Sequence, residues 1–140
     1  MVVKCYLWKK VNMILLVQLS GALLGLLAVI FGAFGAHRLK RSLNPEQLNS
    51  IETGVKYQFY HALLLLVLGF NLGFNSPLET AMAYCFMYGT LLFSFSIYLL
   101  TLLGARGRKV PYLGLLTPLG GLLLVIGWGL LLYSFVADMV

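Results

Sequence analysis

Four long stretches of the chain contain no Asp, Glu, Lys or Arg, and they dominate its hydrophobic pattern. They run from Val11 to Ala36, Tyr57 to Leu78, Thr80 to Ala105 and Val110 to Ala137. Each exceeds the ~20 residues that a helix needs to cross a hydrocarbon core. Backbone groups in lipid must be satisfied within their own segment, so these stretches predict helices. We expect four spans, near residues 12–35, 55–74, 80–103 and 112–136.

The first stretch is preceded by a tail, residues 1–12, that carries Lys4, Lys9 and Lys10. A signal peptide has a similar basic start, but its apolar region has only about 7–15 residues. We therefore expect a retained helix after the tail. Met13 stays open as an alternative start of the chain.

The polar gap between the first two stretches predicts a short amphipathic surface helix over residues 45–54. Asn44 is a good N-cap residue, and Pro45 suits the first helical position. Apolar residues then recur at helical spacing, at Leu48, Ile51, Val55 and Phe59. We expect this helix to lie on the membrane surface and to run into the second span, with a bend at Gly54. The alternative is a solvated loop with a capped turn.

Small residues predict where the helices pack, because small residues let helix backbones approach closely in lipid. The first span has such residues at alternating steps of four and three, at Gly21, Gly25, Ala28, Gly32 and Gly35. The fourth span has Gly120 and Gly121, which follow Pro118. A proline inside a helix removes one ladder hydrogen bond. We therefore expect a kink near residues 114–118 and close packing at the two glycines.

Composition agrees with this pattern. The chain has 140 residues, of which 61% are hydrophobic and 10% charged, and its mean hydropathy is +0.93. That leaves too little polar surface for a soluble fold, since soluble domains have about 25% charged residues. The sequence predicts an all-α polytopic membrane protein: one domain over residues 1–140, with four transmembrane helices in a compact bundle and the surface helix between the first two spans.

The net charge of +6 comes from basic residues in the gaps and the tail. This placement suits anionic headgroups and orientation in the plasma membrane, and it argues against nucleic acid as a partner. Seven basic residues flank the first and third gaps, against three in the tail; the seven are Arg38, Lys40, Arg41, Lys56, Arg106, Arg108 and Lys109. We expect loops 36–54 and 104–111 to be cytoplasmic and both termini to lie outside.

The ionisable residues at the first gap form a candidate polar cluster of His37, Glu52, Tyr57 and His61. Three hypotheses compete for it. His61 and Tyr57 hydrogen-bond the first span or the loop and hold helices together, which we favour. Alternatively, the two histidines and Glu52 form a proton relay or ligand site, because intramembrane ionisable residues are often functional. The third hypothesis is a metal site, but no HxxxH, HExxH or CxxC spacing supports it, and we expect no metal.

Several motifs resemble the YgdD-like family of small four-helix membrane proteins, a domain of unknown function. They are GAFGAH at 32–37, ETGVKYQFYHALLLL at 52–66, LFSFSIY at 92–98 and LTPLGG followed by GW at 116–128. The resemblance covers residues 13–136 and implies four spans but no activity. By resemblance, the signature positions are His37, Glu52, Tyr57, Gln58, His61, Ser94, Tyr98, Thr117, Pro118, Gly120, Gly121 and Trp128.

No catalytic constellation or phosphate-binding loop is recognisable. We expect a non-enzymatic scaffold or accessory protein without a cofactor, which has the lipid bilayer and a second copy of the chain as its partners. The alternative is a transport or permeation protein for protons or a small solute. A water-filled cavity at His61 would favour transport, and a solid core with His61 bonded to backbone would favour the scaffold.

Overall fold

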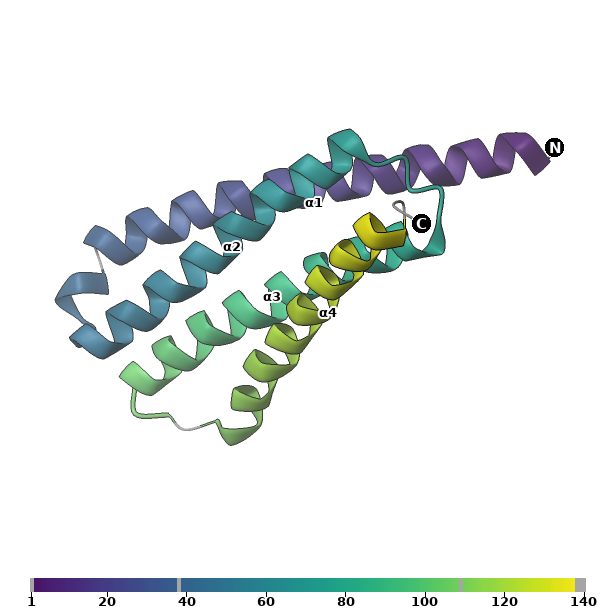
Figure 1. Cartoon of the computed structure of the whole chain (residues 1–140). Helices are drawn as coiled ribbons and strands as arrows, with labels where there is room; N and C mark the ends of the chain where they lie inside the picture. The colour runs from purple at the N-terminus through teal and green to yellow at the C-terminus, as the bar shows by residue number, and fades with distance from the viewer. Residues whose placement is uncertain (1, 38, 109, 138–140) are drawn as a thin grey trace.

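Four long helices make up most of the computed structural model, which describes the backbone at residues 2–37, 39–108 and 110–137 and the side chains at 10–35, 39–108 and 110–137. The helices are α1 (Val2–His37), α2 (Pro45–Asn71), α3 (Pro77–Ala105) and α4 (Leu116–Ala137). Two short 3-10 helices, η1 (Leu39–Arg41) and η2 (Pro111–Leu115), lie in the connections (Figure 1). The predicted all-α class is confirmed.

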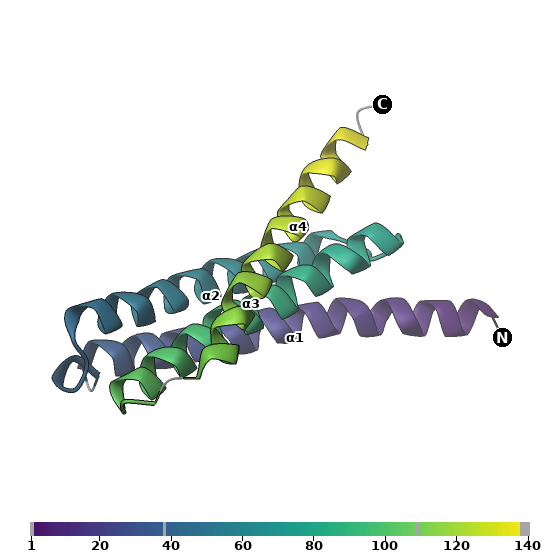
Figure 2. The same cartoon turned by 90° about the horizontal axis from the view of Figure 1, so that it is seen from below.

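Successive helices run antiparallel (Figure 1). The α1–α2 and α3–α4 connections lie at one end, and the helix ends nearest both termini lie toward the other. The small residues of α1 face α2: a Cβ added at Gly21 would lie 3.0 Å from the Ala62 carbonyl oxygen, and one added at Gly35 would lie 3.4 Å from Ile51 Cγ2. These pairs give the register of the hairpin. In Figure 2, α4 diverges from the other helices toward its C-terminus, so the arrangement is more open than the predicted compact bundle.

α1 and α2 both differ in extent from the predicted elements. α1 begins at Val2, so the residues predicted as a tail continue the helix. No Gly or Pro interrupts this part of the sequence. α2 is one helix through Gly54, where we predicted a bend between two segments. Gly54 packs against the ring of Tyr98, with Cε1 only 2.6 Å from the Cβ that a larger residue would carry. The glycine therefore accommodates a neighbouring helix and does not break its own.

The predicted start of α2 is confirmed as a capping box. Asn44 Oδ1 accepts from the Gln47 amide at 2.8 Å, and Gln47 Oε1 accepts from the Asn44 amide at 3.0 Å. Two amide donors that the helix itself leaves unsatisfied thereby find partners. This local arrangement is why α2 starts at Pro45.

The predicted kink near residues 114–118 is corrected. α4 begins at Leu116, directly after η2, so Pro118 lies in the first turn of the helix. The first amides of an α-helix have no intrahelical acceptor, so a proline there costs no ladder bond. Pro118 therefore marks a helix start and not a break within a helix.

Three helices are long and apolar enough to cross a membrane, over Lys10–Arg41, Pro77–Ala105 and Pro111–Ala137. α2 is not among these candidates in the described chain. Its N-terminal half carries Glu46, Glu52 and Lys56, and its uncharged part from Tyr57 to Asn71 is shorter than the ~20 residues of a typical span.

Candidate functional site

A buried polar network occupies the middle of the helices, and Gln58 is its centre. Gln58 is fully buried on α2. Its Nε2 donates to the Leu24 carbonyl oxygen of α1 at 2.8 Å. Its Oε1 accepts from the Tyr98 hydroxyl of α3 at 2.9 Å. One side chain thus connects three helices, and both ends of its amide have a partner.

His61 follows Gln58 by one turn on the same face of α2 and connects this helix to α4. His61 is 5% exposed, and its Nδ1 lies 2.7 Å from the Tyr57 carbonyl oxygen. Trp128 Nε1 donates to His61 Nε2 at 3.3 Å. A carbonyl only accepts and an indole N–H only donates. Both bonds therefore require the neutral tautomer with its proton on Nδ1.

Aromatic rings enclose His61. Its ring centroid lies 6.1 Å from that of Tyr57, 5.9 Å from Phe86 and 6.3 Å from Trp128. The Tyr57 ring also lies 4.8 Å from Phe93 of α3. The imidazole is therefore held between three helices by apolar surfaces as well as by its two hydrogen bonds.

The serine and threonine hydroxyls of α3 mostly bond carbonyls of their own helix. Thr90 Oγ1 donates to the Phe86 carbonyl at 2.6 Å. Ser96 Oγ donates to the Phe93 carbonyl at 2.9 Å and also lies 2.7 Å from Thr117 Oγ1 of α4. Ser94 is different, because its buried Oγ has no hydrogen-bond partner in the described chain. The serine and threonine hydroxyls of α3 thus contribute one link to another helix among the described residues, at the start of α4.

The structure does not bring the predicted cluster together. Glu52 pairs with Lys56 at 2.8 Å on the exposed face of α2. Glu52 precedes His61 by nine residues, about 13 Å along the helix axis at 1.5 Å per residue. Among Glu52, Tyr57 and His61, whose side chains the structure describes, only Tyr57 and His61 are in contact.

His37 is also far from His61 along the bundle. Its backbone closes α1, and its side chain lies outside the described part of the structure. Ala62 lies opposite Gly25, with 3.8 Å between the Ala62 Cβ and a Cβ added at Gly25. His61 is therefore level with Gly25, and His37 is twelve residues further along α1, about 18 Å away at 1.5 Å per residue. Among the described residues, no three His, Cys, Asp or Glu side chains are grouped as metal ligands.

Hydrophobic periodicity and local spacing did not identify Gln58 as a site residue. It appears only among the signature positions of the family resemblance. One signal in the residues was available. Gln58 and His61 are polar residues three positions apart in a charge-free stretch, and Gln18 is a similar isolated amide in α1. Gln18 Nε2 donates to the Gly69 carbonyl of α2 at 2.9 Å. Gln18 and Gln58 therefore both link α1 to α2.

The closest described approach of the α1 glycines to α2 is at Gly21, where an added Cβ would lie 3.0 Å from both the Ala62 oxygen and Leu66 Cγ. At Gly25 the nearest atom is 3.8 Å away, and at Gly32 and Gly35 it is 3.4 Å away. Ala28, also in this row, is buried.

Gly21→Ala is expected to destabilise the protein by about 1–3 kcal/mol, because the new methyl group overpacks the helix contact. Gly25→Ala is the matched control and should be neutral or slightly stabilising, since its methyl group meets ordinary contact distances. Thermal unfolding of both variants in the same detergent tests this. Equal melting temperatures would contradict the close approach at Gly21.

Three cavities of about 650, 370 and 310 Å³ lie on the described residues, and His61 lines none of them. The largest lies between α1 and the start of α3. The second lies between the C-terminal half of α1 and α2, beside Gly32 and Gly35. The third lies between α2, α3 and Thr117. The described cavities are thus separate from the Gln58–His61 network.

Comparison with known proteins identifies the family. The model of a family described as "Protein of unknown function (DUF423)" matches residues 31–121, which include Gln58, His61 and Tyr98. UPF0382 membrane protein YwdK of Bacillus subtilis is 39% identical over 110 residues, 77% of this chain and 85% of its own length. UPF0382 membrane protein SERP0230 of Staphylococcus epidermidis is 40% identical over 108 residues, 77% and 84% of the two chains.

UPF0382 membrane protein SSP2132 of Staphylococcus saprophyticus is 38% identical over 108 residues, 77% of this chain and 86% of the relative. No solved structure matches the chain. The names of these three relatives do not include the YgdD-like name, which stays an expectation. The matches place the protein in the membrane, in agreement with its apolar helices. The chain belongs to the DUF423 family of membrane proteins.

Proposed function

We propose that this protein is a non-enzymatic scaffold or accessory protein of the plasma membrane. The observation that carries the proposal is that Gln58 and His61, both buried, each form a hydrogen bond to another helix. Gln58 uses both ends of its amide, and His61 uses both ring nitrogens. A general acid or base needs a ring nitrogen that can reach a substrate. Nδ1 of His61 bonds a backbone carbonyl of its own helix α2, and Nε2 bonds Trp128 of α4.

Transport of protons or a small solute is the competing function. A relay through His61 requires the imidazole to change protonation state. A protonated His61 would present an N–H to the indole N–H of Trp128, so the two donors would oppose each other. The described cavities do not reach the ring. These observations support the scaffold over the relay.

We propose that α2 also crosses the membrane, as a fourth span. It lies antiparallel along α1 from the Gly21 contact to the Gly35 contact, so it occupies the same depth as a helix that is long and apolar enough to span. The polar residues Gln58 and His61 lie on its buried face, where they do not contact lipid. The excess of basic residues supports a cytoplasmic position for the two connections at one end and an outside position for both termini. A reporter fused after Val140 that proves cytoplasmic would overturn this orientation.

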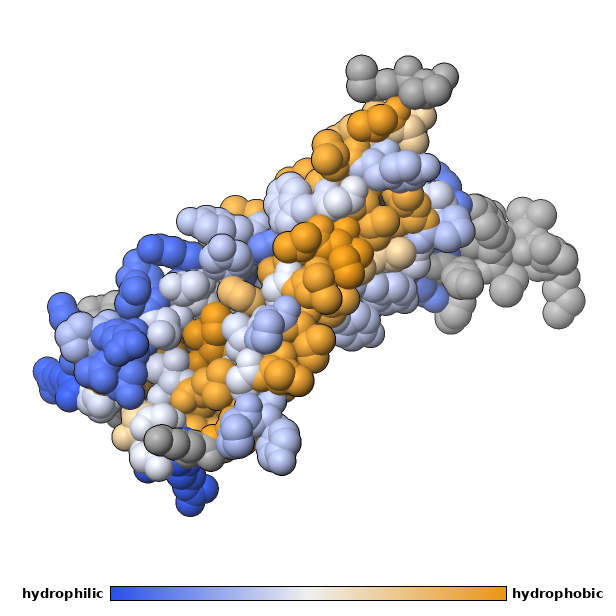
Figure 3. Space-filling model, turned by 60° about the horizontal axis from the view of Figure 1, so that its bottom comes forward, coloured by the Kyte–Doolittle hydropathy of each residue, from blue (hydrophilic) through white to orange (hydrophobic). Residues whose placement is uncertain are grey.

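The outer surface of α4 supports association with a second copy. Figure 3 shows an apolar band along this helix, while hydrophilic residues gather at the end with the two connections. Exposed members of the band include Leu119, Leu122, Val125, Ile126 and Leu132. Only Gly120, Leu124 and Gly127 of the described α4 residues are buried. Lipid or another copy of the chain covers such a face in a bilayer.

The relevant experiment combines stability with proton flux. His61→Ala and Trp128→Phe should each lower stability by on the order of 1 kcal/mol, and the double variant should lose less than the sum. Vesicles that contain the protein and an internal pH-sensitive dye should respond to an imposed pH gradient like protein-free vesicles. Proton flux that the wild type supports and His61→Ala abolishes, with unchanged melting temperature, would replace the scaffold with the relay.

A further inference from the structure

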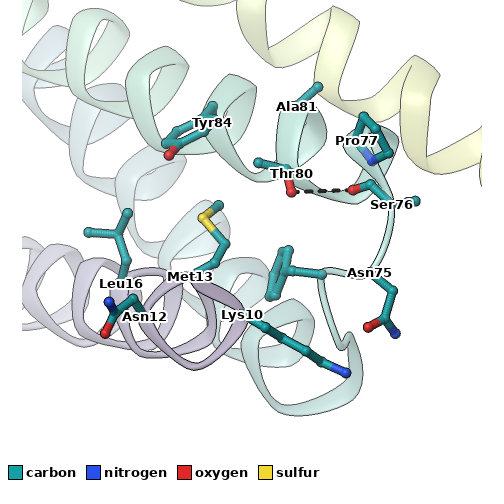
Figure 4. A pocket seen from close by; sticks show the side chains of 11 residues that line it. Lys10, Asn12, Met13, Leu16, Asn75, Ser76, Pro77, Thr80, Ala81 and Tyr84 are labelled. Atoms are coloured by element: carbon teal, nitrogen blue, oxygen red, sulfur yellow. Dashed lines mark hydrogen bonds between the residues drawn. The ribbon is translucent and has the colours of Figure 1, made fainter. Parts of the chain in front are cut away.

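The largest of the three cavities described above lies between α1 and the α2–α3 connection (Figure 4). This end of the molecule is opposite the two basic connections. The volume of the cavity is about 650 Å³, within the range of ligand pockets. Side chains from α1, from the connection and from the first two turns of α3 line it. It is therefore formed by elements that are distant in sequence, and it is separate from the polar network at Gln58 and His61.

The lining has one charged side chain, Lys10, together with apolar side chains and the uncharged polar residues Asn12, Asn75, Ser76 and Thr80. Lys10 of α1 and Asn75 and Ser76 of the connection form the polar mouth. Met13, Leu16, Phe74 and Tyr84 form apolar walls, with Phe74 and Met13 buried. Lys10 and Leu16 are six residues apart, about 9 Å along the helix at 1.5 Å per residue. The cavity thus changes from charged to apolar over a distance comparable to a lipid's headgroup and upper acyl chain.

The charge at the mouth favours an anion. Lys10 Nζ lies against the connection, 3.3 Å from a Cβ added at Gly73, and it is in no ion pair among the described residues. Glu79, the acid in the first turn of α3, does not line the cavity, and its Oε2 accepts from the Asn75 amide of the connection at 2.8 Å. α3 also begins here, and its N-terminus adds a partial positive charge. A lysine at the end of an apolar helix reaches the headgroup layer by extending its stem along apolar surface.

We propose that this cavity binds one anionic phospholipid of the surrounding leaflet. Its phosphate is held at Lys10 and Asn75, and one acyl chain lies against Met13, Leu16, Phe74 and Tyr84. The apolar walls alone would accept any lipid, so the lysine supplies the preference for negative charge. One lysine near an anionic surface contributes about fivefold in affinity.

Native mass spectrometry of the detergent-purified full chain tests this, with phosphatidylglycerol and phosphatidylcholine of identical acyl chains as probes. The wild type should retain one phosphatidylglycerol in preference to phosphatidylcholine. Lys10→Gln should lower retention of phosphatidylglycerol about fivefold and remove the preference. Ala81→Phe, which places a ring in the cavity from an exposed position of α3, should lower retention of both lipids.

Arg108→Gln is the matched control, because Arg108 is an exposed cation at the opposite end and lines none of the three cavities. It should leave retention of both lipids unchanged. Melting temperatures measured without added lipid show that each variant is folded. Unchanged phosphatidylglycerol retention in Lys10→Gln would overturn the proposal, and so would an equal loss in Arg108→Gln, which would show attraction by net charge alone. Neither result depends on whether the protein is a scaffold or a transporter.

Discussion

Gly120→Ala is expected to lower the stability of the protein by about 3 kcal/mol, the upper part of the usual range for overpacking. A Cβ at this position would touch the Phe93 amide nitrogen of α3 and would lie 2.8 Å from Phe93 Cα and 2.9 Å from the Gly89 carbonyl oxygen. All three are backbone atoms, so no side chain can turn aside. The helices must separate instead, which loosens contacts along α3 and α4. Thermal unfolding in detergent measures the loss.

Gly121→Ala is the control for this prediction, because it is adjacent in the same helix. Its added methyl group would meet only the ring of Phe93, at 3.8 Å. Both substitutions raise helix propensity by up to about 1 kcal/mol, so propensity cancels between them. A Gly120→Ala variant that melts at the same temperature as Gly121→Ala would show that α3 and α4 are not in backbone contact here.

Gln58→Leu is expected to cost about 1–3 kcal/mol. The side chain is similar in size, so the loss comes from two hydrogen bonds that join α2 to α1 and α3. Each interhelical hydrogen bond in a membrane contributes about 0.6 kcal/mol on average and up to about 1.7. Tyr98 also loses the acceptor of a buried hydroxyl, which adds to the cost.

Tyr98→Phe separates these contributions, since it removes only the hydroxyl. It should cost less than Gln58→Leu, and adding it to Gln58→Leu should recover part of the loss, because the unsatisfied hydroxyl is then gone. The control is a polar residue of α2 outside the network. Gln47 is unsuitable because it belongs to the capping box. Ser50→Ala is suitable, since the Ser50 hydroxyl bonds only the Glu46 carbonyl of its own helix at an exposed site. A network without structural importance would give Gln58→Leu the melting temperature of Ser50→Ala.

Local features of the chain were predictable because they depend on neighbours in sequence. The capping box at Asn44 involves residues only three positions apart. The apolar stretches are recognised from the number of consecutive residues without a charge. The bend at Gly54 and the kink at Pro118 were not correctly predicted, although both rest on residues that often break helices. The ring of Tyr98 packs against Gly54 from α3, and η2 precedes α4, which begins at Leu116. Both outcomes depend on packing beyond the local segment.

The candidate site shows the same division. Helical spacing placed Tyr57 and His61 together, since residues four apart share a face. The relative depth of His37 and His61 depends on the register of the α1–α2 hairpin, which no local pattern contains. The partner of Gln58 is 34 positions away at Leu24, and that of His61 is 67 positions away at Trp128. Hydrogen-bond capacity was visible in the residue types, but the choice of partner was not.

The sequence by itself determined that the chain is helical and belongs in a membrane. Apolar stretches of this length have no other stable arrangement in lipid, because each backbone group must be satisfied inside its own helix. Only the tertiary structure decided which polar residues lie together. Lipid supplies little hydrophobic force between helices, so the register follows from close contacts such as Gly120 with Phe93 and from polar links such as Gln58 with Tyr98.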